Sequence, residues 1–226
     1  MSGHKKRLSM LAVVAIIAFA ITSRGCAESL ATTIVHLTQS SGGHHAIYAA
    51  SASGTVFIST DQARSWSTVT SPPAPVKNGD VASLYAIAAD PLDAATAYVS
   101  FYHPYFDEPA DVLVRTTDSG GTWSVMQSFP GSAAAAIHVD PTGTLLVGAD
   151  FGVYVSTDGG FSWKAGKGSE SDGFPIVNRE VAAFAGSTAP GAFLYAIGEH
   201  NSSHPYSDIY RSADGGLTWS RCNSPL

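Results

Sequence analysis

The chain has 226 residues, of which 45% are hydrophobic and only 13% are charged. These totals are typical of a globular protein with one sizeable core, and they exclude an intrinsically disordered chain. The formal net charge of −6 argues against nucleic-acid binding, which requires a basic surface. The two cysteines form no zinc-type pair, so we expect neither a metal site nor a cofactor.

Residues 1–27 are typical of an export segment. A basic stretch from Lys5 to Arg7 precedes an apolar run over residues 8–21, which is too short to span a membrane comfortably. Cleavage is expected after Ala20 or after Ala27, and the alternatives are lipidation of Cys26 or an uncleaved anchor. We therefore expect a secreted or envelope-associated protein that meets a membrane only through this segment.

Residues 28–226 repeat one eight-residue motif four times, at positions 59–66, 116–123, 156–163 and 212–219. Strand-like runs precede and follow each copy, which predicts that the motif is the turn of a β-hairpin. The aspartate is expected to accept hydrogen bonds from backbone N–H groups, and the glycine two residues later permits a left-handed backbone. In the first copy Ala63 replaces this glycine, which predicts a strained or differently shaped turn. The aspartates and closing tryptophans are Asp61, Trp66, Asp118, Trp123, Asp158, Trp163, Asp214 and Trp219.

The motif resembles the Asp-box, or bacterial neuraminidase repeat, Ser/Thr-x-Asp-x-Gly-x-Thr-Trp. This repeat is found on the blades of β-propellers in sialidases, xyloglucanases, sortilin-type receptors and photosystem II assembly factors. The resemblance implies an all-β fold, a β-propeller with four Asp-box blades of four antiparallel strands each. It implies no particular activity, because the functions of such proteins differ widely.

The apolar runs between motif copies indicate where the strands of each blade lie. We expect strands at 32–38, 45–50, 55–59 and 65–69, then 84–87 and 97–100, then 137–139, 145–147 and 153–155, and finally 181–185, 193–197, 208–211 and 218–221. Successive motif aspartates are 57, 40 and 56 positions apart, and no gap can hold two blades, so the expected count is four. We expect the blades to close into a ring. The competing account is a piece of a larger propeller, or a chain that self-associates to complete its ring.

The second and fourth blades contain long loops that share the sequence His-Pro-Tyr, at 103–105 and 204–206. This recurrence indicates that a two-blade unit was duplicated. In a closed ring of four, the two blades face each other, so their loops are expected to meet on the face opposite the motif turns. We call this face, which the inter-blade linkers also reach, the loop face.

The loop face is the predicted binding face, since loops on a rigid scaffold often bind. Tyrosines there suit a sugar ring or a partner protein, and histidines with carboxylates suit acid–base chemistry or a metal site. The plainer interpretation is that His-Pro-Tyr merely shapes each loop. The predicted binding residues are His103, Tyr105, Asp107, His204, Tyr206, Asp208 and Arg179, with Glu108, Glu180 and Asp80 nearby.

Sialidase activity is not expected, because sialidases hold their substrate with three arginines. Beyond the export segment, only Arg179 lies away from the motif hairpins, so the chain cannot supply such a set on the loop face. Other glycoside hydrolases need two carboxylates, which Asp107 or Glu108 could supply opposite Asp208.

Cys26 and Cys222 lie before the first blade and at the end of the last. A disulfide between them would close the ring, much as hemopexin-type propellers are closed, provided that Cys26 survives processing. We expect a non-catalytic recognition or assembly module for a protein or a cell-envelope glycan. The alternative is a glycoside hydrolase that uses the loop carboxylates.

Overall fold

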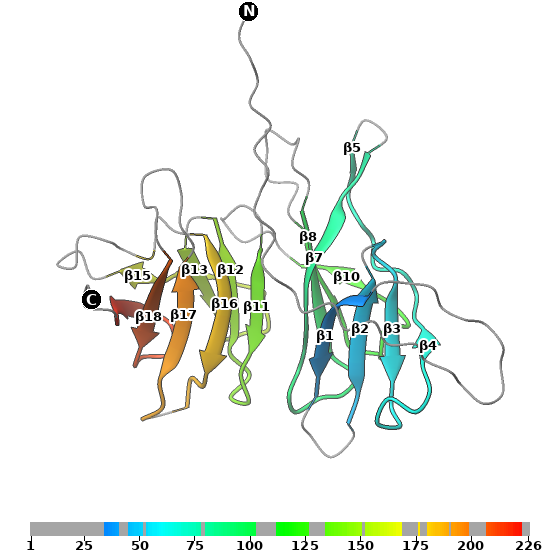
Figure 1. Ribbon diagram of the computed structural model, residues 1–226, viewed down its shortest axis with the longest axis horizontal. Coiled ribbons are helices and arrows are strands. Elements are labelled where there is room, and N and C mark those ends of the chain that lie inside the picture. The colour runs from blue at the N-terminus through cyan, green and yellow to red at the C-terminus, as the bar shows by residue number, and fades with distance from the viewer. Residues whose placement is uncertain are drawn as a thin grey trace, which may run out of the picture.

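The computed structural model describes residues 34–40, 45–51, 53–77, 80–102, 112–126, 134–150, 152–168, 176, 180–189, 191–198 and 207–222. The predicted all-β class is confirmed, because these residues form four antiparallel sheets that lie side by side (Figure 1). In this part of the chain, no helix is long and apolar enough to cross a membrane.

Each of the four sheets is built on four strands that pair in chain order with their neighbours, and the last sheet gains a fifth strand at its edge. The first sheet holds β1 (Ile34–Gln39), β2 (Ile47–Ser51), β3 (Val56–Ser59) and β4 (Ser67–Thr68). The second holds β7 (Ser83–Ala89), β8 (Ala97–Tyr102), β9 (Leu113–Thr116) and β10 (Ser124–Val125). The third holds β11 (Ala136–Val139), β12 (Leu145–Ala149), β13 (Gly152–Ser156) and β14 (Lys164–Ala165). The fourth holds β16 (Val181–Gly186), β17 (Leu194–Gly198), β18 (Asp208–Ser212) and β19 (Thr218–Arg221).

Three further short strands lie in segments that we expected to be linkers. β5 (Val76–Lys77) and β6 (Asp80–Val81) form a separate hairpin between the first and second sheets. β15 (Lys167–Gly168) follows the third sheet and pairs with β19 in parallel, so it becomes the outer edge of the fourth sheet.

The hydrophobic core consists of three clusters, each between two successive sheets. Tyr48 and Val99 belong to the first cluster, and Tyr98 and Leu145 belong to the second. The third cluster contains Trp219, which is only 1% exposed. Both faces of β12 and β13 are buried because a neighbouring sheet covers each side. Burying side chains of this size contributes roughly 1.5–3 kcal/mol each.

The predicted closed ring is wrong for the part of the chain that the structure describes. The first strands of successive sheets contact one another, β1 with β7, β7 with β11, and β11 with β16. Among the described strands, β16 has no comparable contact with β1. The two end sheets therefore each keep a side that no other described sheet covers.

The four motif turns share one backbone shape, with two successive residues in the left-handed region. The fourth turn places Gly215 and Gly216 there, with φ of 74° and 91°. The first turn keeps this shape with Gln62 and Ala63, at φ of 64° and 65°. Ala63 therefore strains the turn rather than reshaping it, since a left-handed φ is unfavourable for a residue with a Cβ atom.

Candidate binding site

The motif aspartates act inside their own turns. Asp158 accepts hydrogen bonds from the Ser162 backbone N–H at 2.9 Å, the Ser162 hydroxyl at 2.5 Å and the Ser156 hydroxyl at 2.7 Å. Hydrogen bonds from the Ser162 side chain and backbone hold the pKa of Asp158 well below its usual value. The carboxylate is thus ionised and engaged by the turn, which leaves it poorly suited to proton transfer.

Asp208 is also engaged within its own sheet. The Asp208 side chain is 1% exposed, and its Oδ1 accepts a hydrogen bond from Arg221 Nε at 2.8 Å. Arg221 Nη2 forms an ion pair with the same oxygen at 2.6 Å. The two residues lie on the neighbouring strands β18 and β19. This buried ion pair gives Asp208 a structural role in the fourth sheet.

Most other predicted binding residues lie outside the described part of the chain, and so does Cys26. These residues are His103, Tyr105, Asp107, Glu108, Arg179, His204 and Tyr206. Cys222 is exposed, and no residue in the described part of the chain pairs with it. The disulfide with Cys26 stays a prediction.

The loop-face ends of the second, third and fourth sheets bring together two tyrosines and two carboxylates. Tyr85 lies near the start of β7 and Tyr102 at the end of β8. Asp150 directly follows β12, and Glu180 directly precedes β16. We call these four residues the axial cluster, because β7 and β16 belong to the row of contacting first strands.

One contact within the axial cluster joins two sheets that are not neighbours in the chain, and the other lies within the second sheet. The Tyr85 hydroxyl donates a hydrogen bond to Glu180 Oε1 at 3.2 Å, from the second sheet to the fourth. The Tyr85 and Tyr102 rings stack with centroids 5.1 Å apart and an interplanar angle of 29°.

Electrostatics keep the Tyr85 phenol protonated. Burial raises the pKa of Tyr85 well above its usual value, and the charge and hydrogen bond of Glu180 and the charge of Asp150 raise it further. The cluster therefore brings together a neutral phenol whose one proton is donated to Glu180, an aromatic surface and two carboxylates. Such a set suits a partner that presents basic groups or N–H donors together with apolar area.

Glu180 was predicted near the loop face, whereas Tyr85, Tyr102 and Asp150 were not predicted as site residues. Tyr85 and Tyr102 stand in apolar runs that predict strands, which hides a binding role. The position of these tyrosines along their strands could have indicated a binding role. Each tyrosine lies within two residues of the strand end that faces the predicted loops.

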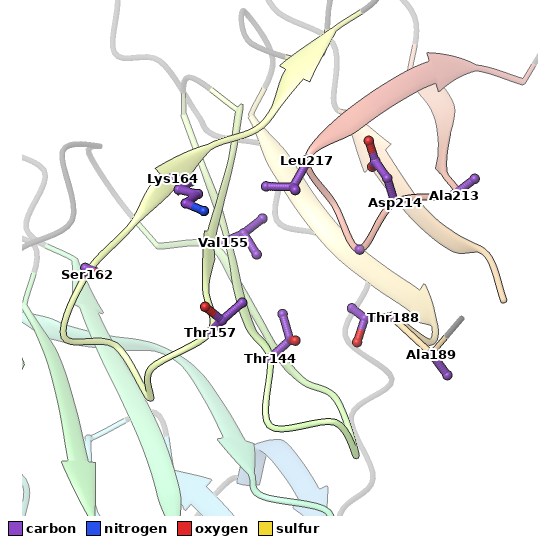
Figure 2. Close-up of a pocket in the computed structure, with 11 residues that line it drawn as sticks. Thr144, Val155, Thr157, Ser162, Lys164, Thr188, Ala189, Ala213, Asp214 and Leu217 are labelled. Carbon is purple, nitrogen blue, oxygen red and sulfur yellow. The ribbon is translucent and has the colours of Figure 1, made fainter. Parts of the chain in front are cut away.

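A hollow lies at the end of the sheets opposite the axial cluster, between the third and fourth motif turns (Figure 2). Its volume is about 330 Å³, and Figure 2 shows Lys164 and Asp214 on opposite sides of it. Asp214 already accepts hydrogen bonds from the backbone and hydroxyl of Thr218 at 2.8 and 2.5 Å. Most of the remaining lining is small, namely Ser, Thr, Ala and Gly, with Val155 and Leu217 as its larger apolar residues. The axial cluster is therefore the better candidate.

Within the described residues, no group of three or more His, Cys, Asp or Glu side chains could hold a metal ion. The axial cluster thus has to be judged by hydrogen bonding, charge and aromatic area.

Comparison with known proteins supports the fold. No family model matches the chain, and no curated protein matches its sequence. Among solved structures, "YCF48 bound to D1 peptide" is similar over 86% of this chain and 54% of that chain, with 16% identity and a TM-score of 0.55. YCF48 from Cyanidioschyzon merolae matches over 87% and 58% of the two chains, with 15% identity and a TM-score of 0.53.

A GH74 enzyme from Niastella koreensis is similar over 88% of this chain and 26% of that enzyme, with 20% identity and a TM-score of 0.57. The chain thus spans about half the length of the YCF48 chains and about a quarter of the GH74 enzyme. All of these neighbours are β-propeller proteins, and the similarity is distant. The chain therefore has a β-propeller type of fold.

Proposed function

We propose that this protein is a non-catalytic recognition module that binds a protein segment at the axial cluster. The observation that carries the proposal is the Tyr85–Glu180 hydrogen bond, which fixes an aromatic and acidic surface between two sheets at the loop face. The similar fold of YCF48, a protein bound to a D1 peptide in its structure, adds support at the level of the fold.

The chemistry of the cluster favours a peptide with basic side chains. Carboxylates form charge-assisted hydrogen bonds with Lys and Arg, and tyrosines provide rigid contact area at protein interfaces. The predicted loop residues Tyr105 and Tyr206 would extend the same surface if their loops meet there. In this proposal the four sheets are propeller blades that hold the surface rigid.

The test is a binding assay on an array of synthetic peptides that vary in basic and aromatic content. We expect the wild type to bind basic peptides, and Tyr102→Ala and Glu180→Gln each to weaken binding by about tenfold or more, which corresponds to ~1.4 kcal/mol. Phe161→Ala is the matched control, because Phe161 is an exposed aromatic residue on the third motif turn. Equal binding by all four proteins, or binding of no peptide, would overturn the proposal.

A glycoside hydrolase is the second candidate, and the pair of carboxylates around Tyr85 is what favours it. Asp150 and Glu180 both act on that phenol, and hydrolases of this kind work with two carboxylates. Asp208 gives this candidate little support because Arg221 holds its carboxylate. Release of sugar from a panel of polysaccharides, lost in both Asp150→Asn and Glu180→Gln, would favour the enzyme.

A further inference from the structure

The hollow of Figure 2 lies where the third sheet presents small side chains to the fourth. In each of the first three sheets, the residue directly before the motif and its register partner on the preceding strand pack toward the next sheet. These pairs are Ile58 with Tyr48, Arg115 with Tyr98, and Val155 with Leu146. The three junctions between successive sheets can therefore be compared position by position.

Large side chains fill this place in the first two junctions. The Tyr48 hydroxyl donates a hydrogen bond to the Ala94 carbonyl, which belongs to the loop between β7 and β8, at 2.8 Å. The guanidinium carbon of Arg115 lies 5.7 Å from the centroid of the Tyr98 ring. A Cβ atom on Gly159, in the third motif turn, would lie 3.5 Å from Arg115 Nη1. A tyrosine or an arginine thus reaches across to the next sheet.

Leu146 and Val155 are shorter, so the third junction keeps an open space. Gly215 corresponds to Gly159, and apart from its chain neighbours a Cβ atom there would meet only Thr188 Cβ, at 3.9 Å. The volume of about 330 Å³ is at the lower end of the range of roughly 300–1,000 Å³ that is typical of ligand pockets. The hollow therefore follows from the sequence of the third sheet, and it has room for one small molecule.

Threonine hydroxyls line the hollow from two sheets. Thr144 directly precedes β12, and Thr188 lies in the loop between β16 and β17. The Thr142 hydroxyl lies 3.1 Å from the Thr144 hydroxyl and 2.7 Å from the Thr188 hydroxyl, and Asp140 accepts a hydrogen bond from the Thr188 N–H. Thr157 adds a third hydroxyl from the third motif turn. Because these bonds fix the wall in advance, less ordering has to accompany binding of a ligand.

Lys164 gives the hollow a positive charge. It is exposed on β14, and Figure 2 shows it across the hollow from Asp214. Among the described residues, no carboxylate pairs with its ammonium group. Asp214 accepts hydrogen bonds from the Ser212 hydroxyl and from the backbone and hydroxyl of Thr218, which occupy three of its roughly four acceptor sites. The hollow therefore favours an anionic group beside Lys164 and a hydroxyl donor toward Asp214.

A sugar acid has both kinds of group. Its carboxylate can form charge-assisted hydrogen bonds with an ammonium group, and its ring hydroxyls donate and accept as the threonines do. The lining, within the described part of the chain, contains no aromatic side chain, so charge and hydrogen bonds have to provide the recognition. We propose that the hollow binds a small sugar acid, with the carboxylate at Lys164 and the hydroxyls at the three threonines. This site is separate from the axial cluster and opposite to it in charge.

The first test is isothermal titration calorimetry of the full chain with sodium glucuronate, glucose and sodium acetate as separate probes. We expect glucuronate to bind at least about tenfold more tightly than either of the others, because glucose lacks the charge and acetate lacks the hydroxyls. Absence of glucuronate binding would overturn the proposal. Equal binding of glucose would reject the role of the charge, and equal binding of acetate would reject the choice of a sugar acid.

The second test locates the site with variants of exposed residues. Lys164→Met should weaken glucuronate binding by about tenfold or more, and Thr157→Val should weaken it by about threefold. The matched control is Lys167→Met, since Lys167 is also an exposed lysine but does not line the hollow. Full binding by Lys164→Met, or an equal loss in Lys167→Met, would overturn the proposal. Glu180→Gln should bind glucuronate like the wild type, so failure of the axial cluster as a peptide site is a separate result.

Discussion

The four motif turns show how one carboxylate organises a hairpin end. Asp118 accepts hydrogen bonds from the Thr122 N–H at 2.8 Å, the Thr122 hydroxyl at 2.7 Å and the Thr116 hydroxyl at 2.8 Å. The Thr116 hydroxyl in turn accepts from the Gly120 N–H at 2.9 Å. These bonds fix the two left-handed residues between them, so the turn tolerates Ala63 at the cost of strain.

Glycine should be more stable than alanine at this motif position in both the first and the second turn. We expect Ala63→Gly to raise the free energy of unfolding by ~1 kcal/mol, because it removes a Cβ atom from a left-handed residue. Gly120→Ala should lower it by more than ~2 kcal/mol, since its Cβ atom would also collide with Val69. Urea unfolding of both variants checks this, and equal shifts would contradict it.

Acid should destabilise the protein over a defined pH range. Burial by itself raises the pKa of Asp140, but hydrogen bonds from Thr188 and Thr142 outweigh it and hold that pKa well below its usual value. Hydrogen bonds from the Ser65 side chain and backbone lower the pKa of Asp61 to about 2. Each group therefore stabilises the fold above the unfolded pKa of about 4, and this stability is lost as pH falls through the folded pKa.

The measurement is the urea midpoint between pH 7 and pH 2. We expect a steady fall below pH 4 in the wild type, and a smaller fall in Asp140→Asn. That variant should also be less stable at pH 7 by about 1–3 kcal/mol, because Asp140 accepts the Thr188 N–H at 2.6 Å and is 1% exposed. An unchanged pH dependence in Asp140→Asn would contradict the assignment.

At the scale of elements, the Asp208–Arg221 pair joins the last two strands of the fourth sheet. Asp208→Ala should destabilise the protein by about 1–3 kcal/mol, because it removes the buried carboxylate that accepts from Arg221. Removing both charges, as in Asp208→Ala with Arg221→Met, should recover much of this loss. Thermal unfolding followed by circular dichroism measures both, and an unaffected Asp208→Ala protein would contradict the structural role.

The strands themselves were largely predictable from the sequence, because β-branched and aromatic runs flank motifs that specify turns. β15 was not, because Lys167–Gly168 has no apolar pattern and its partner β19 lies far along the chain. The Tyr85–Glu180 contact was equally hidden, since it joins residues 95 positions apart through the arrangement of sheets. Ring closure was predicted wrongly, because motif spacing reports the size of each repeat and says nothing of the curvature between repeats.

At the scale of the whole molecule, export is a proposal that the mature protein's mass can test. Cleavage after Ala20 would retain Cys26, and cleavage after Ala27 would remove it. We expect intact-mass measurement of protein from an exporting host to show loss of residues 1–20 or 1–27. A chain of full length would contradict cleavage, whereas an added diacylglycerol mass would identify lipidation.

The parallel pairing of β15 with β19 has a consequence for synthesis. Lys167 leaves the ribosome well before Thr218, its partner in the register, so the chain must hold β15 unpaired until the C-terminal hairpin emerges. Nascent chains arrested before Thr218 should therefore expose the segment around Lys167 to protease. Protection of that segment should then arise together with the last strand, which makes the third and fourth sheets a single cooperative folding unit.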